Sequence, residues 1–195
     1  MPEALTLGFD TSAAHCAAAL LSGDALIAGR HEDMAKGQAE RLMPLIGEML
    51  ADAGAAWRDL SLIGVGTGPG NFTGIRISVA AARGLALSLG IPAIGVGAAE
   101  ALAFGLPRPC RIVIPARRET AIWQDFGTVD SAPRQSPLAV LPPGPPAAVP
   151  RVSIAEGIAR IARERRTVPQ PRPAPIYLRP ADAAPARDRG PVMLP

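Results

Sequence analysis

Short apolar runs alternate with turn residues over the first thirty positions of the chain. Three of these runs have the length of strands, at residues 5–9, 16–21 and 25–31. The segments between them, residues 10–12 and 22–24, consist of residue types that favour tight turns. The pattern therefore predicts an antiparallel meander of three strands at the start of the chain.

Two segments with helical periodicity follow, one on each side of a short apolar strand. Apolar residues recur every three or four positions across residues 36–52 and again across residues 73–89. Pro44 is expected near the first turn of the first helix or at a kink in it. The run at residues 62–66 lies between the helices and predicts a β–α–β connection with parallel strands.

The second half of the chain first continues this alternation of strands and helices and then becomes rich in proline. A short strand is predicted at residues 93–96, a helix at 98–104, and a hairpin from residues 110–114 and 120–126. Residues 133–195 hold 15 of the 22 prolines, so this stretch is expected to be mainly extended loop. The capping box formed by Ser153 and Glu156 predicts one helix within it.

A glycine-rich turn joins the strand at residues 62–66 to the long helix after it. Its spacing matches neither the P-loop nor the dinucleotide-binding pattern, so it is either a phosphate-binding turn or a tight turn without a ligand. Thr73 is the expected N-cap of the helix. At the first hairpin turn, the carboxylate and two hydroxyls either hold a hydrated metal or contact phosphate, or they cap a tight turn by bonding their own backbone. The candidate residues in these two phosphate-loop-like turns are Asp10, Thr11, Ser12, Gly68, Pro69, Gly70, Asn71, Phe72, Thr73, Gly74 and Arg76.

Groups that usually carry catalysis are sparse in this sequence. His15 and His31 are the only histidines and do not form a metal-binding pair, and Lys36 is the only lysine. There is no nucleophile elbow of the G-x-S-x-G type. We therefore predict no catalytic residues and no metal site.

The composition of the chain bears on its cellular compartment and on its charge. The two cysteines, Cys16 and Cys110, are isolated, which fits a reducing cytoplasm, and no run of 18 uncharged apolar residues predicts a membrane span. Residues 127–195 carry ten Arg and five Asp or Glu. This basic excess can serve RNA phosphates, but a general preference for Arg over Lys explains it more simply, since 19 of the 20 basic residues are Arg.

Several motifs together resemble the TsaB (YeaZ) family. They are LxxDTS ending at Ser12, LMPLIGEML at residues 42–50, GPGNFTGIR at residues 68–76, and PIYLR at residues 175–179. The resemblance covers about residues 4–126 and resumes at PIYLR. In the glycine block only Asn71 departs from the family pattern GPGSFTGxR.

The resemblance implies an α/β, actin-like (ASKHA, ribonuclease H-like) fold of mixed sheets with helices. It places an N-terminal lobe at residues 1–106 and a reduced second lobe at residues 107–195, with the proline-rich loop and the C-terminal segment. It also implies a non-catalytic subunit that supports TsaD in transferring threonylcarbamoyl to the adenosine next to the tRNA anticodon. A TsaE-like ATPase joins that assembly, and tRNA is reached through the complex.

The two helices that flank the glycine turn build the family's interface with TsaD and its homodimer. We therefore expect a charge at Leu45 to abolish the complex. No firmly bound cofactor is expected, and a nucleotide at the partner interface is left open. The residues assigned to this interface are Gln38, Arg41, Leu42, Leu45, Ile46, Met49, Ile75, Val79 and Arg83.

Some positions depart from the family pattern. Pro115 stands where the family has Asp in Ile-Asp-Ala-Arg, and Gln38 stands where a His is common. An alternative function is that of an actin-like ATP-binding enzyme that acts alone, and these changes weigh against it. A glycoprotease of the M22 type is weaker still, because its metal ligands are missing. Direct tRNA contact through the arginines at residues 160–166 is a further hypothesis, for which a solvated helix face is the simpler explanation.

Overall fold

A five-stranded mixed sheet forms the centre of the molecule in the computed structural model, which describes residues 4–178. Its strand order is β3-β2-β1-β4-β5, with β1, β2 and β3 antiparallel and β1, β4 and β5 parallel. The predicted meander and the predicted β–α–β connection are both confirmed. The strands are β1 (Leu5–Asp10), β2 (His15–Ser22), β3 (Ala25–Asp33), β4 (Leu60–Gly66) and β5 (Ala93–Val96).

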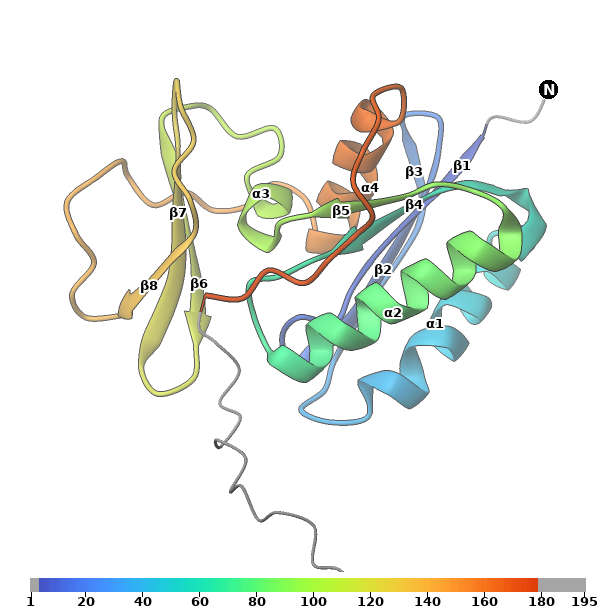
Figure 1. Cartoon of the computed structure of the whole chain (residues 1–195), viewed down its shortest axis with the longest axis horizontal. Coiled ribbons are helices and arrows are strands. Elements are labelled where there is room, and N and C mark those ends of the chain that lie inside the picture. The colour runs from blue at the N-terminus through green and yellow to red at the C-terminus, as the bar shows by residue number, and fades with distance from the viewer. Residues whose placement is uncertain (1–3, 179–195) are drawn as a thin grey trace, which may run out of the picture.

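Two helices, α1 (Gln38–Asp52) and α2 (Phe72–Leu89), lie side by side on one face of this sheet (Figure 1). The main core fills the space between them and the sheet. It contains Leu7 and Phe9 from β1 and Leu45 and Met49 from α1, all fully buried. The α1 helix continues through Pro44, and a short 3₁₀ helix, η1 (Trp57–Asp59), leads into β4.

The opposite face of the sheet is covered by α4 (Ile154–Arg165), beside the short α3 (Ala98–Leu102) (Figure 1). Two glycines that pair across β1 and β4, Gly8 and Gly64, lie directly beneath α4. A Cβ at Gly64 would be 2.9 Å from side-chain atoms of both Ile158 and Ala162. These glycines therefore allow the helix to rest on the backbone of the sheet.

A smaller antiparallel sheet of three strands follows, in the order β6-β7-β8. Its strands are β6 (Cys110–Ala116), β7 (Thr120–Phe126) and β8 (Arg134–Pro137). The first two are the predicted hairpin, whereas β8 lies where we expected loop. Arg111 is buried and binds Asp125 and the carbonyl oxygens of Pro142 and Pro143. It thus ties the proline-rich loop to this sheet.

The predicted lobe boundary at residue 106 separates the two sheets but not the helices. The α4 helix follows the second sheet in the chain, yet it packs on β1, β2 and β4 of the first. Its apolar stripe needs a sheet face to cover, and that face is left open by α1 and α2. The C-terminal part of the predicted second lobe, with Arg179 of the PIYLR motif, lies outside the described residues.

The long helix α2 has the length and mean hydropathy that a membrane-spanning helix requires. The buried helices of water-soluble domains often meet the same criterion. One side of α2 packs on β4, and the opposite side carries the exposed Arg76 and Arg83. The predicted absence of a membrane span stays a prediction.

Candidate functional site

The glycine turn and the first hairpin turn lie directly against each other at the carboxyl ends of β1 and β4. The amide of Asn71 donates to the carbonyl oxygen of Ser12 at 2.6 Å, and the Thr11 hydroxyl donates to the carbonyl oxygen of Gly74 at 2.7 Å. A Cβ at Gly70 would overlap the carbonyl oxygen of Ser12, and a Cβ at Gly74 would overlap that of Thr11. The glycines are therefore needed for close contact between the two turns.

The start of α2 differs from the prediction. Asn71, not Thr73, is the N-cap, and its side chain accepts a hydrogen bond of 3.0 Å from the Gly74 amide. Thr73 lies inside the first helical turn and is exposed. Asn and Ser are both strong N-cap residues, so Asn71 can cap this helix as a family Ser would.

Most polar groups of the first turn are used within the protein, but the Asp10 Oδ1 atom is buried and has no hydrogen-bond partner among residues 4–178. The buried Asp10 accepts hydrogen bonds of 2.8 Å from the Ser12 amide and hydroxyl, and His15 Nε2 lies 2.7 Å from the same oxygen. Its other oxygen lies against Gly66, where a Cβ would overlap it. Because the turns fill the space between them, this geometry favours the tight-turn alternative over a phosphate site, and the hydrated-metal alternative stays a prediction.

The C-terminal PIYL segment packs on the exposed side of the glycine turn. The Ile176 amide donates to the carbonyl oxygen of Thr67 at 2.8 Å, and Arg76 Nε donates to the Tyr177 hydroxyl at 3.0 Å. Phe72 contacts both Arg76 and Tyr177. The Arg76 guanidinium lies 3.8 Å from the centre of the Phe72 ring, and the centres of the Phe72 and Tyr177 rings are 4.9 Å apart. Two motifs about a hundred residues apart thus form one structural unit.

His15 and Tyr177 were not among the predicted site residues. The role of His15 depends on the β1–β2 hairpin, which turns it back toward Asp10. Tyr177 was noted only as part of a motif, and nothing in the local pattern indicated a contact with Phe72 and Arg76. In both cases the signal lies in the tertiary arrangement of the chain.

The predicted interface residues on α1 and α2 are mostly buried in the core of this chain. Six of them face the sheet and are at most 2% exposed, so the prediction chose the wrong face of each helix. An apolar stripe at helical spacing marks the side that packs on the chain's own sheet. These six residues are Leu42, Leu45, Ile46, Met49, Ile75 and Val79.

The polar members of the predicted interface are partly engaged elsewhere. Arg41 forms hydrogen-bonded ion pairs with Glu32 on β3 and Glu48 on α1, at 2.6–2.8 Å. These bonds lower the pKa of both carboxyl groups and raise the pKa of Arg41. Gln38 donates to the Met34 carbonyl oxygen, whereas Arg83 is exposed.

The opposite side of α1 and α2 is free within the described residues, and we call it the outer helix face. It combines apolar and small residues, and the Leu87 side chain is 86% exposed. A Cβ at Gly84 would meet no atom within 4 Å. The outer helix face is defined by Met43, Pro44, Gly47, Ala80, Gly84 and Leu87.

The basic face of α4 is largely neutralised by acidic residues of the chain itself. Arg160 pairs with Glu156, Arg163 with Asp24, and Arg165 with Glu100. Only Arg166 of this group has no acidic partner among residues 4–178. This pairing favours a structural role for the face over direct tRNA contact.

A small pocket between the two sheets, about 270 Å³ in volume, carries the carboxylates of Glu100 and Asp130. Both side chains form ion pairs with arginines, Arg165 and Arg108, so the pocket presents no excess of positive charge to a phosphate. Across residues 4–178, no three His, Cys, Asp or Glu side chains gather as a metal site would require.

Comparisons with known proteins identify relatives of this chain. The family model of TsaD, tRNA N6-adenosine threonylcarbamoyltransferase, matches residues 32–136. The tRNA threonylcarbamoyladenosine biosynthesis protein TsaB of Escherichia coli is 31% identical over 125 residues, which are 62% of this chain and 54% of that protein. The TsaB protein of Bacillus subtilis is 42% identical over 97 residues, 50% of this chain and 42% of that protein.

The fold agrees with a solved relative. The structure of YeaZ from Pseudomonas aeruginosa matches with a TM-score of 0.73 and 23% identity, covering 90% of this chain and all of that one. The predicted α/β fold of mixed sheets with helices is thereby confirmed as the fold of YeaZ. The chain spans about half the length of the curated relatives it matches. With the family model matching more than half of its residues and the TsaB motifs joined in one structural unit, the chain belongs to the TsaD family, within its TsaB/YeaZ group.

Proposed function

We propose that this chain is a non-catalytic subunit in tRNA threonylcarbamoyladenosine biosynthesis, which binds a TsaD-like subunit through its outer helix face. The names of its relatives support the pathway. The glycine turn is filled by the first hairpin turn, and catalytic groups are sparse in the sequence. Both observations favour the role of an accessory subunit over that of a catalytic one. In this proposal the TsaD-like partner transfers threonylcarbamoyl to adenosine in the cytoplasm, with a TsaE-like ATPase, and tRNA is met through the complex.

The outer helix face is the single observation that carries the proposal. It is the exposed side of two helices that lie side by side, and it includes small exposed residues such as Ala80 and Gly84, so a partner helix can approach closely. The exposed Leu87 and Met43 supply apolar area that such a partner would cover. The same face can serve a homodimer when the partner is absent.

The sharpest test places a bulky charge at Gly84. Because a Cβ there meets open space and glycine is a poor helix former, Gly84→Arg should leave the fold at least as stable. We expect the variant to lose co-purification with the TsaD-like subunit of the same source, and the mixture to lose threonylcarbamoyl transfer. Gly29→Arg is the matched control, since Gly29 on β3 also has no atom within 4 Å of a Cβ.

A pair of α1 variants separates loss of the interface from loss of the fold. Met43 is 38% exposed, so Met43→Arg should weaken the complex without unfolding the chain. Leu45 is fully buried, and a charge there should unfold the chain, because an unpaired buried charge is strongly destabilising. Normal complex formation by both Gly84→Arg and Met43→Arg would contradict the proposal. ATP hydrolysis by the purified chain alone would favour the enzyme instead.

A further inference from the structure

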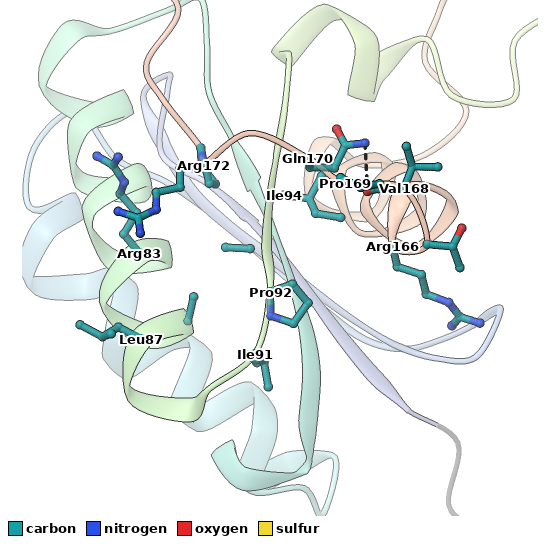
Figure 2. Close-up of a pocket in the computed structure, with 14 residues that line it drawn as sticks. Arg83, Leu87, Ile91, Pro92, Ile94, Arg166, Val168, Pro169, Gln170 and Arg172 are labelled. Carbon is teal, nitrogen blue, oxygen red and sulfur yellow. Dashed lines mark hydrogen bonds between the residues drawn. The ribbon is translucent and has the colours of Figure 1, made fainter.

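A groove on the first sheet borders the outer helix face and shares Leu87 with it. It has a volume of about 740 Å³ and runs between the second half of α2, the edge strand β5 and the segment that follows α4. Figure 2 shows Arg83 and Leu87 projecting from α2 on one side of the strand, with residues 166–170 on the other. Its floor is aliphatic and includes Ala86, Ile91 and Ile94.

The floor of this groove includes an open strand edge. Along β5, the carbonyl oxygens of Pro92 and Val96 accept hydrogen bonds from Ile63 and Thr67 on the β4 side. Alternation along a strand then directs the backbone groups of Ala93 and Gly95 away from β4. Pro173 packs at 3.5 Å from the Cβ position of Gly95, and a proline nitrogen cannot donate a hydrogen bond. Among residues 4–178, the amide and the carbonyl of Ala93 at the groove thus have no backbone hydrogen-bond partner.

The groove is also strongly basic. Arg83, Arg166 and Arg172 line it, and none of them has an acidic partner among residues 4–178. By contrast, most arginines on neighbouring elements, such as Arg163 and Arg165, are ion-paired. Unpaired positive charges around one groove attract a ligand that brings negative charge.

We propose that this groove binds an acidic, extended segment of a partner protein. The segment adds to the free edge at Ala93, its apolar side chains contact Leu87 and Ile94, and its carboxylates face Arg83, Arg166 and Arg172. Strand addition of this kind takes its affinity from main-chain hydrogen bonds and its specificity from alternate side chains. A protein segment fits better than RNA, because the floor is aliphatic and the lining residues that the structure describes include no aromatic side chain on which bases could stack.

The test uses the full chain and a short fluorescein-labelled peptide that alternates Glu and Val, followed by fluorescence anisotropy. We expect saturable binding that weakens with salt, and no binding of the matching peptide with Lys in place of Glu. The double variant Arg166→Glu/Arg172→Glu should raise the Kd about tenfold or more, since each reversal replaces attraction by repulsion. Arg83 and Leu87 stay unchanged, because they lie on or beside the outer helix face.

Two further variants make the result specific. Arg134→Glu reverses one charge on the distant β8, half the charge change of the double variant, and should leave the Kd unchanged. Ala93→Pro removes the amide hydrogen at the edge of β5, where proline is tolerated. This variant should bind the peptide more weakly, while its thermal unfolding stays cooperative. Equal losses with Arg134→Glu, equal binding of the Lys peptide, or no binding at all would overturn the proposal. Tighter binding of single-stranded poly-uridine than of the acidic peptide would assign the groove to nucleic acid instead.

Discussion

At the scale of single residues, this protein uses glycine and buried polar groups to bring backbone segments together. Gly70 and Gly74 let the glycine turn lie against the first hairpin turn, and Asp10 binds the Ser12 amide within that hairpin turn. The sequence shows that these glycines are unusual but not what they approach. Their neighbours come from residues about sixty positions away, so local turn chemistry left two alternatives open.

Cys16 gives a prediction at this scale. Its thiol is fully buried on β2, and burial, with a smaller effect from Glu32, raises its pKa from 9.0 to about 11. The folded state therefore disfavours the thiolate. Stability from this group is present below pH 9 and is lost as the pH rises from 9 toward 11.

The measurement is urea unfolding at several pH values, with Cys16→Ala as the comparison. The chain should lose more stability than Cys16→Ala over this pH window, by about 2 kcal/mol. Cys16 in the folded chain should also react slowly with a disulfide reagent at pH 8. Equal pH dependence of both proteins would show that the buried thiol does not titrate as described.

At the scale of elements, each helix has one face that the chain itself buries and one that it leaves free. The periodicity of α1 and α2 predicted their extents well, because an apolar stripe is a local property. The periodicity did not indicate which surface the stripe packs against. We therefore predicted that six residues contact a partner protein, although they lie in the core of this chain. The α4 helix shows the same limit, since its place on β1 and β4 depends on glycines in those strands.

The contact between α4 and the sheet can be tested at Gly64. A Cβ there would lie 2.9 Å from Ile158 and Ala162, and both helix backbone and side chains are in the way. Gly64→Val should therefore lower the free energy of unfolding by about 1–3 kcal/mol, the usual range for overpacking. Urea unfolding measures the change.

Gly29→Val on β3 is the matched control, because a side chain at Gly29 meets open space. It should be neutral or slightly stabilising, since valine favours strands. If both variants have the same stability, the close approach of α4 to the sheet is not a real constraint.

At the scale of the whole molecule, the chain builds its first sheet, forms the second, and then returns to cover the first. One face of the five-stranded sheet is covered by α1 and α2, and the other only by segments that come later in the chain (Figure 1). Ile154 and Ile158 of α4 complete the second core with Ala17 and Ala19 of β2. The N-terminal part is therefore not a complete unit in itself.

Ending the chain at residue 150 tests this dependence. The fragment keeps every strand that the structure describes but loses α4, so the apolar face under that helix becomes exposed to water. We expect it to associate or to lose cooperative unfolding, as measured by gel filtration and by circular dichroism during heating. A monomeric fragment with the unfolding midpoint of the full chain would contradict this view of the fold.

By itself, the sequence determined the order and type of most elements, the turns between them and the family. These properties depend on side-chain periodicity, turn chemistry and short motifs, all of which are local. Only the tertiary structure decided which helix faces are free, that the glycine turn is closed by the hairpin turn, and that Tyr177 meets Phe72 and Arg76. Those outcomes depend on contacts between residues far apart in the chain, whose energies no local pattern contains.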